Sequence, residues 1–167
     1  MTATFDDVLD ANRHYADDFQ LSGFDGIARA GVAMVTCMDS RIEPLKMIGL
    51  QAGDAKILRN PGGRVTDDAL RSLVIAANVL GVRRIMVVAH TDCAMAATTD
   101  EELRARLTER FPTADLGSIE FFTSRDQLGS LQTDIDRLRD CDLFPEDVEI
   151  GGFRYDVGTG LLEQVIH

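Results

Sequence analysis

Short apolar runs and helical repeats alternate along this chain. Three runs of strand length span residues 31–36, 55–59 and 84–89, and glycine, proline or charged residues bound them. The third run is apolar from Ile85 to Ala89, as expected of a strand that is covered on both faces. We therefore predict three strands before residue 90.

Two segments have the spacing of amphipathic helices. The first begins at Thr66, which can cap a helix, and ends at Gly81. The second spans residues 126–140. The apolar positions that recur at helical spacing are Leu70, Leu73, Val74 and Ala77 in the first segment and Leu128, Leu131, Ile135 and Leu138 in the second. We expect each set to form the buried face of its helix.

The remaining segments give weaker signals. Residues 4–20 predict a short helix, which either lies across a partner subunit or covers its own chain. Thr98-Thr99-Asp100-Glu101 resembles a capping box before a polar helix, and residues 111–125 are ambiguous. Residues 147–157 predict a last strand, with Gly151-Gly152 as a bulge or kink.

Strands that alternate with helices favour an α/β fold. We expect a mainly parallel central β-sheet flanked by helices, with an added edge strand near the C-terminus. A chain of 167 residues suits one core, so we expect a single domain of residues 1–167 with an N-terminal helical arm of residues 1–25. In open α/β sheets, ligands bind beyond the carboxyl ends of the strands.

Charge and composition narrow the class of partner. The net charge is 17 − 28 = −11, which disfavours nucleic acid and anionic membranes and favours a small-molecule substrate. The first residues lack the apolar stretch of a secretory signal, so we expect a cytoplasmic protein. Three cysteines without such a signal do not indicate a disulfide framework. Among these, Cys141 ends a predicted helix and suits a half-buried position rather than a ligand.

Candidate chemistry lies at the carboxyl ends of two predicted strands. Cys37 follows the run of residues 31–36, and His90 and Cys93 follow the run of residues 84–89. If these strands are neighbours, two sulfurs and one ring nitrogen converge at one rim of the sheet. Thiolate and imidazole are preferred zinc ligands, and three protein ligands leave one position open, as in catalytic sites.

Charged side chains accompany these candidate ligands. Asp39 and Arg41 lie two residues apart, so the guanidinium can fix the carboxylate in its ionised form beside a metal. Asp39 alone is equally consistent with a loop acid that makes a turn bond. Asp92 either supports the candidate metal ligands through hydrogen bonds without binding the metal itself, or is a surface acid. Gly62-Gly63 either lets backbone approach the pocket or simply makes a tight turn.

Four motifs resemble those of the β-class carbonic anhydrases, especially the short bacterial branch. They are CMDSR (37–41), GDAKILRNPGG (53–63), TDDALRSL (66–73) and HTDC (90–93). The resemblance extends from residue 31 to residue 98 and returns in the final FRYDVGTG segment, whereas residues 100–146 match only in general character.

This resemblance implies a function and a set of site residues. It implies one Zn²⁺ per chain, held by Cys37, His90 and Cys93, with Asp39 and Arg41 as the catalytic pair and Asp39 able to replace the water as fourth ligand. The implied reaction is the reversible hydration of carbon dioxide to bicarbonate and a proton by zinc-bound hydroxide. The resemblance also implies a homodimer or a higher even-numbered homo-oligomer.

Two alternatives stay open. Relatives of this kind also hydrolyse carbonyl sulfide or carbon disulfide at the same zinc site, and Ala94 keeps this substrate class open because family members usually carry glycine there. The second alternative is a non-catalytic zinc or redox-sensing homologue whose thiolates release metal on oxidation. Intact Asp39 and Arg41 argue against a sensor, which needs no oriented carboxylate.

Overall fold

Strand β1 (Val32–Cys37) is buried along its whole length, and parallel strands border it on both sides. The computed structural model describes residues 4–167, in which five strands form one sheet in the order β2-β1-β3-β4-β5. The other strands are β2 (Ala55–Asn60), β3 (Arg84–His90), β4 (Glu149–Tyr155) and β5 (Leu162–Ile166). The first four strands are parallel, and β5 pairs antiparallel with β4 at the edge, which confirms the predicted fold class.

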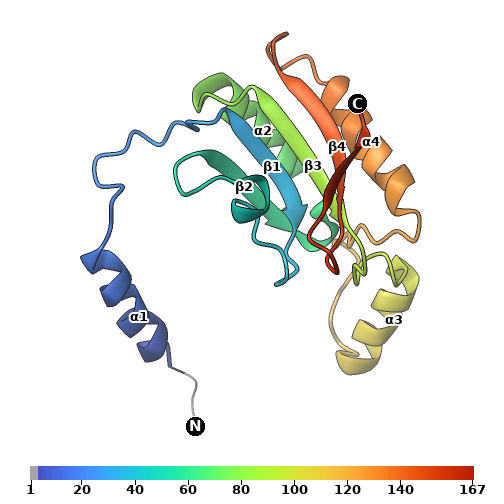
Figure 1. The fold of residues 1–167 in the computed structure, drawn as a ribbon. Coiled ribbons are helices and arrows are strands. Elements are labelled where there is room, and N and C mark those ends of the chain that lie inside the picture. Colours follow the sequence, from blue (N-terminus) through green and yellow to red (C-terminus); the bar gives the residue numbers. More distant parts are fainter. Residues whose placement is uncertain (1–3) are drawn as a thin grey trace.

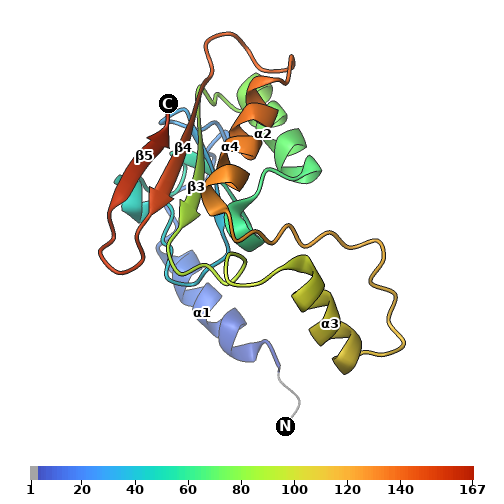
Figure 2. The same ribbon diagram turned by 90° about the vertical axis from the view of Figure 1, so that its right-hand side faces the viewer.

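In residues 4–167, four α-helices accompany the sheet. They are α1 (Asp6–Asp17), α2 (Asp67–Val79), α3 (Asp100–Arg110) and α4 (Gln127–Arg139), with short 3₁₀ helices η1 (Lys46–Ile48) and η2 (Pro61–Gly63). Helices α2 and α4 lie against one face of the sheet, whereas α1 and α3 extend away from it (Figures 1 and 2). Neither α1 nor α3 has a buried residue. Within the described residues, every helix is too short or too polar to span a bilayer.

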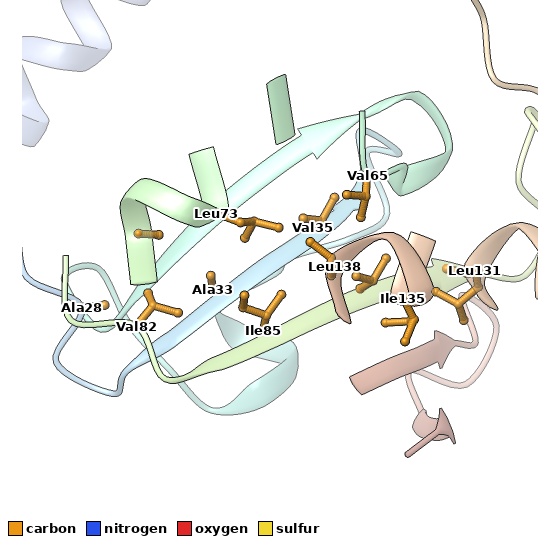
Figure 3. Packing of buried hydrophobic residues seen from close by; sticks show 13 residues of the cluster. Ala28, Ala33, Val35, Val65, Leu73, Val82, Ile85, Leu131, Ile135 and Leu138 are labelled. Carbon is orange, nitrogen blue, oxygen red and sulfur yellow. The ribbon is translucent and has the colours of Figure 1, made fainter. Parts of the chain in front are cut away.

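The main core lies between the sheet and the helices α2 and α4. Side chains from β1 and β3 meet those of both helices in one cluster (Figure 3), which includes Ala33, Val35, Leu73, Val82, Ile85, Val87, Leu131, Ile135 and Leu138. Burial of this apolar surface stabilises the pairing of β1 with β3, because both strands supply alternate residues to the same cluster.

Helix α2 follows the sequence prediction closely. The Thr66 side chain accepts a hydrogen bond from the Ala69 amide and caps the helix, and Gly81 follows its end with φ +77°. Leu73 and Ala77 are buried as predicted, while Leu70 and Val74 are half-buried. The buried face is completed by Ala69 and Ala76, so it is rotated slightly from the predicted one.

Three local predictions were wrong. The capping box pairs Thr99 with Glu102, because helix α3 starts one residue later than predicted. Leu128 is 51% exposed, since it lies in the first turn of α4. The strand predicted at 147–157 is β4 and is not the last one, because the chain turns back and adds β5. A register irregularity does occur at Gly152/Phe153, near the predicted bulge.

The N-terminal arm stands apart from the sheet. Helix α1 is joined to β1 by an extended segment (Figure 1) and leaves its apolar side chains exposed. The exposed apolar residues are Val8, Leu9 and Tyr15 in the helix and Phe5 and Phe19 at its two ends. The helix therefore does not cover its own chain, and residues 1–3 of the predicted arm lie outside the described residues.

Candidate metal centre

The predicted ligands lie together at the carboxyl ends of two adjacent strands. Cys37 is the last residue of β1 and His90 the last of β3, and these strands pair in parallel with Thr36 opposite Val88. A two-residue turn after His90 returns the chain so that Cys93 faces the same point. The two sulfurs and a ring nitrogen of His90 all lie within 4.8 Å of one another.

One ring nitrogen of His90 is hydrogen-bonded, and the other has no hydrogen-bond partner. Its Nδ1 lies 2.8 Å from the Thr91 carbonyl oxygen, to which it donates in the tautomer that leaves Nε2 unprotonated. Among buried side-chain nitrogen and oxygen atoms in residues 4–167, only His90 Nε2 lacks a hydrogen-bond partner. A buried, unpaired nitrogen beside two buried sulfurs is the donor set that zinc prefers, so these residues fit a zinc ion.

The two thiols differ in acidity because they interact with each other. The pKa of Cys37 falls to about 4, chiefly because its sulfur accepts a hydrogen bond from Cys93 and also interacts with His90 and the Gly62 amide. The pKa of Cys93 rises because its proton is held by Cys37 and because the thiol is buried. The Cys37 thiolate in turn raises the pKa of His90. Within this pair of thiols, the contacts favour the thiolate at Cys37.

Asp39 is a fixed carboxylate beside these donors. Its Oδ1 accepts from the Arg41 amide at 2.9 Å and from Arg41 Nε at 2.9 Å, and its Oδ2 accepts from Arg41 Nη2 at 2.8 Å. These bonds hold the pKa of the Asp39 carboxyl well below its usual range and raise the pKa of Arg41. Asp39 is therefore ionised and points in one direction at neutral pH.

Arg41 also contacts the second ligand segment. Its Nη1 donates to Asp92 Oδ2 at 2.7 Å, and its Nη2 donates to the Asp92 carbonyl at 3.0 Å. Asp92 combines the two interpretations, because its side chain is 78% exposed and yet pairs with Arg41. Nothing in the spacing of the motifs gave this contact, because the two residues are 51 positions apart.

The NPGG segment brings backbone against the ligands. Gly62 has φ +80°, and its amide donates to Cys37 Sγ at 3.3 Å. Gly63 has φ +67°, and a Cβ there would lie 3.0 Å from the amide of Cys37, the carbonyl carbon of Thr36 and the carbonyl oxygen of Val88. The glycines therefore serve close approach as well as a turn.

Sequence reasoning missed two polar residues that support the site. Arg59 donates from Nε to the Cys37 carbonyl at 3.0 Å and from Nη2 to the Asp39 carbonyl at 2.6 Å. Gln127 donates from Nε2 to the His90 carbonyl at 2.9 Å. Arg59 lies in β2, two residues before Gly62-Gly63, and its place in this motif could have indicated a role at the site. Gln127 comes from the distant helix α4, and no sequence pattern connects it with the site.

A pocket of about 450 Å³ opens beside the carboxylate and the sulfurs. Its lining is mostly apolar and includes Met38, Asp39, Pro61, Cys93, Ala94 and Met95. Ala94 is exposed, and the non-glycine residues with positive φ in residues 4–167 are Asp92 and Phe122. The alanine is thus accommodated without backbone strain.

Cys141 lies elsewhere. It is half-buried and lines a groove with Leu70, Val74 and Leu143 on the outer side of α2, and it is not part of the Cys37–His90–Cys93 group.

The chain is similar to known proteins along most of its length. Residues 32–121 match the family model described as carbonic anhydrase. Beta-carbonic anhydrase 1 of Mycobacterium tuberculosis is 34% identical, with 99% of each chain covered. A carbon disulfide hydrolase of an Acidianus species is 33% identical, covering 95% of this chain and 89% of the relative. The crystal structure of a carbonic anhydrase of Streptococcus mutans superposes with a TM-score of 0.89 at 40% identity, with 99% of each chain covered.

The close approach of Gly63 predicts a selective effect of a single methyl group. Gly63→Ala should lower the free energy of unfolding by about 2–3 kcal/mol and reduce the zinc bound per chain, because the added Cβ displaces the end of β1 that carries Cys37. Gly49→Ala is the matched control, since Gly49 has φ +71° but a Cβ added there would meet nothing within 4 Å, and it should cost about 1 kcal/mol. Equal losses, measured by denaturant unfolding and metal analysis, would contradict the role of close approach.

Proposed function

Since the chain belongs to the family of β-class carbonic anhydrases, we propose that it catalyses the reversible hydration of carbon dioxide to bicarbonate and a proton. Cys37, His90 and Cys93 would hold one Zn²⁺ per chain. When bound, zinc lowers the pKa of a coordinated water toward roughly 7 and supplies hydroxide at neutral pH. The observation that carries the proposal is the ionised, oriented carboxylate of Asp39 beside three buried donors of the type that bind zinc.

Asp39 and Arg41 have separate roles in this proposal. Asp39 accepts a hydrogen bond from the attacking group and thereby directs a lone pair toward the substrate carbon. Arg41 keeps Asp39 ionised and fixes its direction by two side-chain bonds. The apolar pocket wall, with Met38, Pro61 and Met95, suits a small molecule without charge.

The alternative is the hydrolysis of carbonyl sulfide or carbon disulfide at the same site. The 33% identity with a carbon disulfide hydrolase supports it, and both substrates are linear triatomic molecules like carbon dioxide. The carbonic anhydrases of Mycobacterium tuberculosis and Streptococcus mutans, at 34% and 40% identity, favour carbon dioxide as the main substrate.

The substrates can be compared directly with zinc-loaded protein. We expect fast hydration of carbon dioxide in a stopped-flow assay and slower release of sulfide from carbonyl sulfide and carbon disulfide. If sulfide release were faster than the hydration of carbon dioxide, the protein would instead be a hydrolase of carbonyl sulfide or carbon disulfide. Inactivity on all three substrates, with one zinc per chain, would favour a zinc or redox-sensing protein.

The role of Asp39 predicts a loss of turnover without a loss of metal. Asp39→Asn should retain zinc, because the three proposed ligands are unchanged, and should reduce kcat/KM for carbon dioxide on the order of 100-fold because the anionic acceptor is lost. Asp68→Asn on the exposed start of α2 is the control and should leave both unchanged. Undiminished hydration by Asp39→Asn would refute the assigned role.

We further propose a cytoplasmic homodimer or a higher even-numbered homo-oligomer. The exposed apolar residues of α1, which extends away from its own sheet, support a second copy as the surface they cover (Figure 1). We also propose that residues 1–167 are one domain with residues 1–25 as its arm.

Helix α1 offers a matched pair of substitutions. Leu9→Asp lies among the apolar side chains of α1 and should raise the dissociation constant of the dimer about tenfold or more. His14→Asp, on the opposite side of the helix, should have little effect. Sedimentation velocity measures the dimer fraction, and an unaltered dimer with Leu9→Asp would exclude α1 from the interface.

A further inference from the structure

The guanidinium of Arg41 is shared between two carboxylates in different segments. On one side it binds Asp39, in the segment that follows β1. On the other side it binds Asp92, which lies between His90 and Cys93 in the segment that follows β3. The guanidinium therefore joins both segments that carry the proposed metal ligands.

The division of donors fixes the plane of the guanidinium. Nε and one bond of Nη2 are used for the two oxygens of Asp39, at 2.9 and 2.8 Å. Nη1 and a second bond of Nη2 are used for the side chain and the carbonyl of Asp92, at 2.7 and 3.0 Å. Because the five N–H groups of arginine form a rigid planar fork, a partner at one end of the fork sets the direction of the other end.

The backbone of Asp92 has a left-handed conformation that allows this contact. Its φ of +55° lies in the left-handed region, which aspartate adopts more readily than most residues. The side chain and the carbonyl oxygen of Asp92 both reach Arg41. The turn that delivers Cys93 thus presents two acceptors to the guanidinium.

The direction of the Asp39 carboxylate depends on this fork. The backbone at Asp39 is held separately, because Arg59 donates to the carbonyl oxygens of Cys37 and Asp39. Among the described residues, Arg41 supplies the hydrogen bonds to the side-chain oxygens of Asp39: its backbone amide and Nε donate to Oδ1, and Nη2 donates to Oδ2. Because the amide keeps Oδ1 in place, a rotation of the guanidinium would turn the carboxylate about Oδ1 and redirect Oδ2 while the backbone stays where it is.

Stability does not account for the arrangement. The side chains of Arg41 and Asp92 are 44% and 78% exposed, and exposed ion pairs contribute little to the free energy of folding. Precise direction is what such a contact can supply, since small displacements of a catalytic group have large effects on rate.

We propose that Asp92 is a positioning residue that aims the Asp39 carboxylate by holding the far end of the Arg41 guanidinium. The inference rests on the proposed function, because it assigns Asp92 to the same reaction. Asp92 itself touches neither substrate nor metal in this role.

Three substitutions separate the side-chain acceptor from the backbone conformation. Asp92→Gly keeps the left-handed turn accessible and removes the acceptor, and it should lower kcat/KM for carbon dioxide roughly tenfold to 100-fold, mainly through kcat. Asp92→Asn keeps an acceptor oxygen and the turn, and it should retain most of the activity. Asp92→Ala loses both and should be at least as impaired as Asp92→Gly. Zinc content and Tm should be unchanged in the Gly and Asn variants.

A double-mutant cycle tests whether Asp92 acts through Asp39. In an Asp39→Asn background, Asp92→Gly should cause little further loss of residual activity, since there is no longer a carboxylate to aim. An undiminished loss in that background would overturn the proposal. Full activity of Asp92→Gly would also overturn it. A loss of activity that matches a loss of bound zinc would overturn it as well, because Asp92 would then support metal binding and not the direction of Asp39.

A measurement without turnover keeps the two proposals apart. Nitrogen-15 NMR of the arginine side chains, with Arg41→Lys to assign the Arg41 signal, should show slow rotation of this guanidinium in the native protein and faster rotation in Asp92→Gly. An identical Arg41 signal in both proteins would overturn the positioning role. An inactive native protein with the expected NMR change would instead refute the proposed function and leave the contact itself supported.

Discussion

The parallel pairing of β1 with β3 is the constraint on which the rest of the site depends. It places Thr36 opposite Val88, so Cys37 and His90 emerge side by side where the two strands end. Both strands are held in this register by the cluster that they share with α2 and α4. Donor groups from two distant parts of the chain, at Cys37 and at His90 with Cys93, are thereby gathered within 4.8 Å.

Hydrogen bonds with backbone groups hold the candidate ligands Cys37 and His90 in place. The Gly62 amide donates to Cys37, the Thr91 carbonyl accepts from His90 Nδ1, and the His90 carbonyl accepts from Gln127. Such contacts fix the direction of a ligand before a metal binds, and they lower the cost of ordering the site. The absence of a Cβ at Gly63 lets η2 lie close enough to make this possible.

Arginine connects the segments around the site. Arg41 joins the two ligand segments, and Arg59 holds the backbone of one of them. Arg64, next to the glycines, makes a largely buried pair with Asp134 of α4 and also donates to the Phe122 carbonyl. A rigid guanidinium with five donors can serve several acceptors at once, and this suits irregular segments that lack ladder hydrogen bonds.

Local patterns in the chain were sufficient to predict most elements and the candidate donors of the site. Periodicity, caps and strand ends located four of the five strands, the helices α1 to α4 and the group Cys37, His90 and Cys93. The strand order, the burial of Asp134 on the apolar side of α4 and the contact of Arg41 with Asp92 became visible only in the folded chain. Asp134 pairs with Arg64, 70 residues away, and Arg41 pairs with Asp92, 51 residues away. A local pattern carries no information about which distant group will pair with a charged side chain.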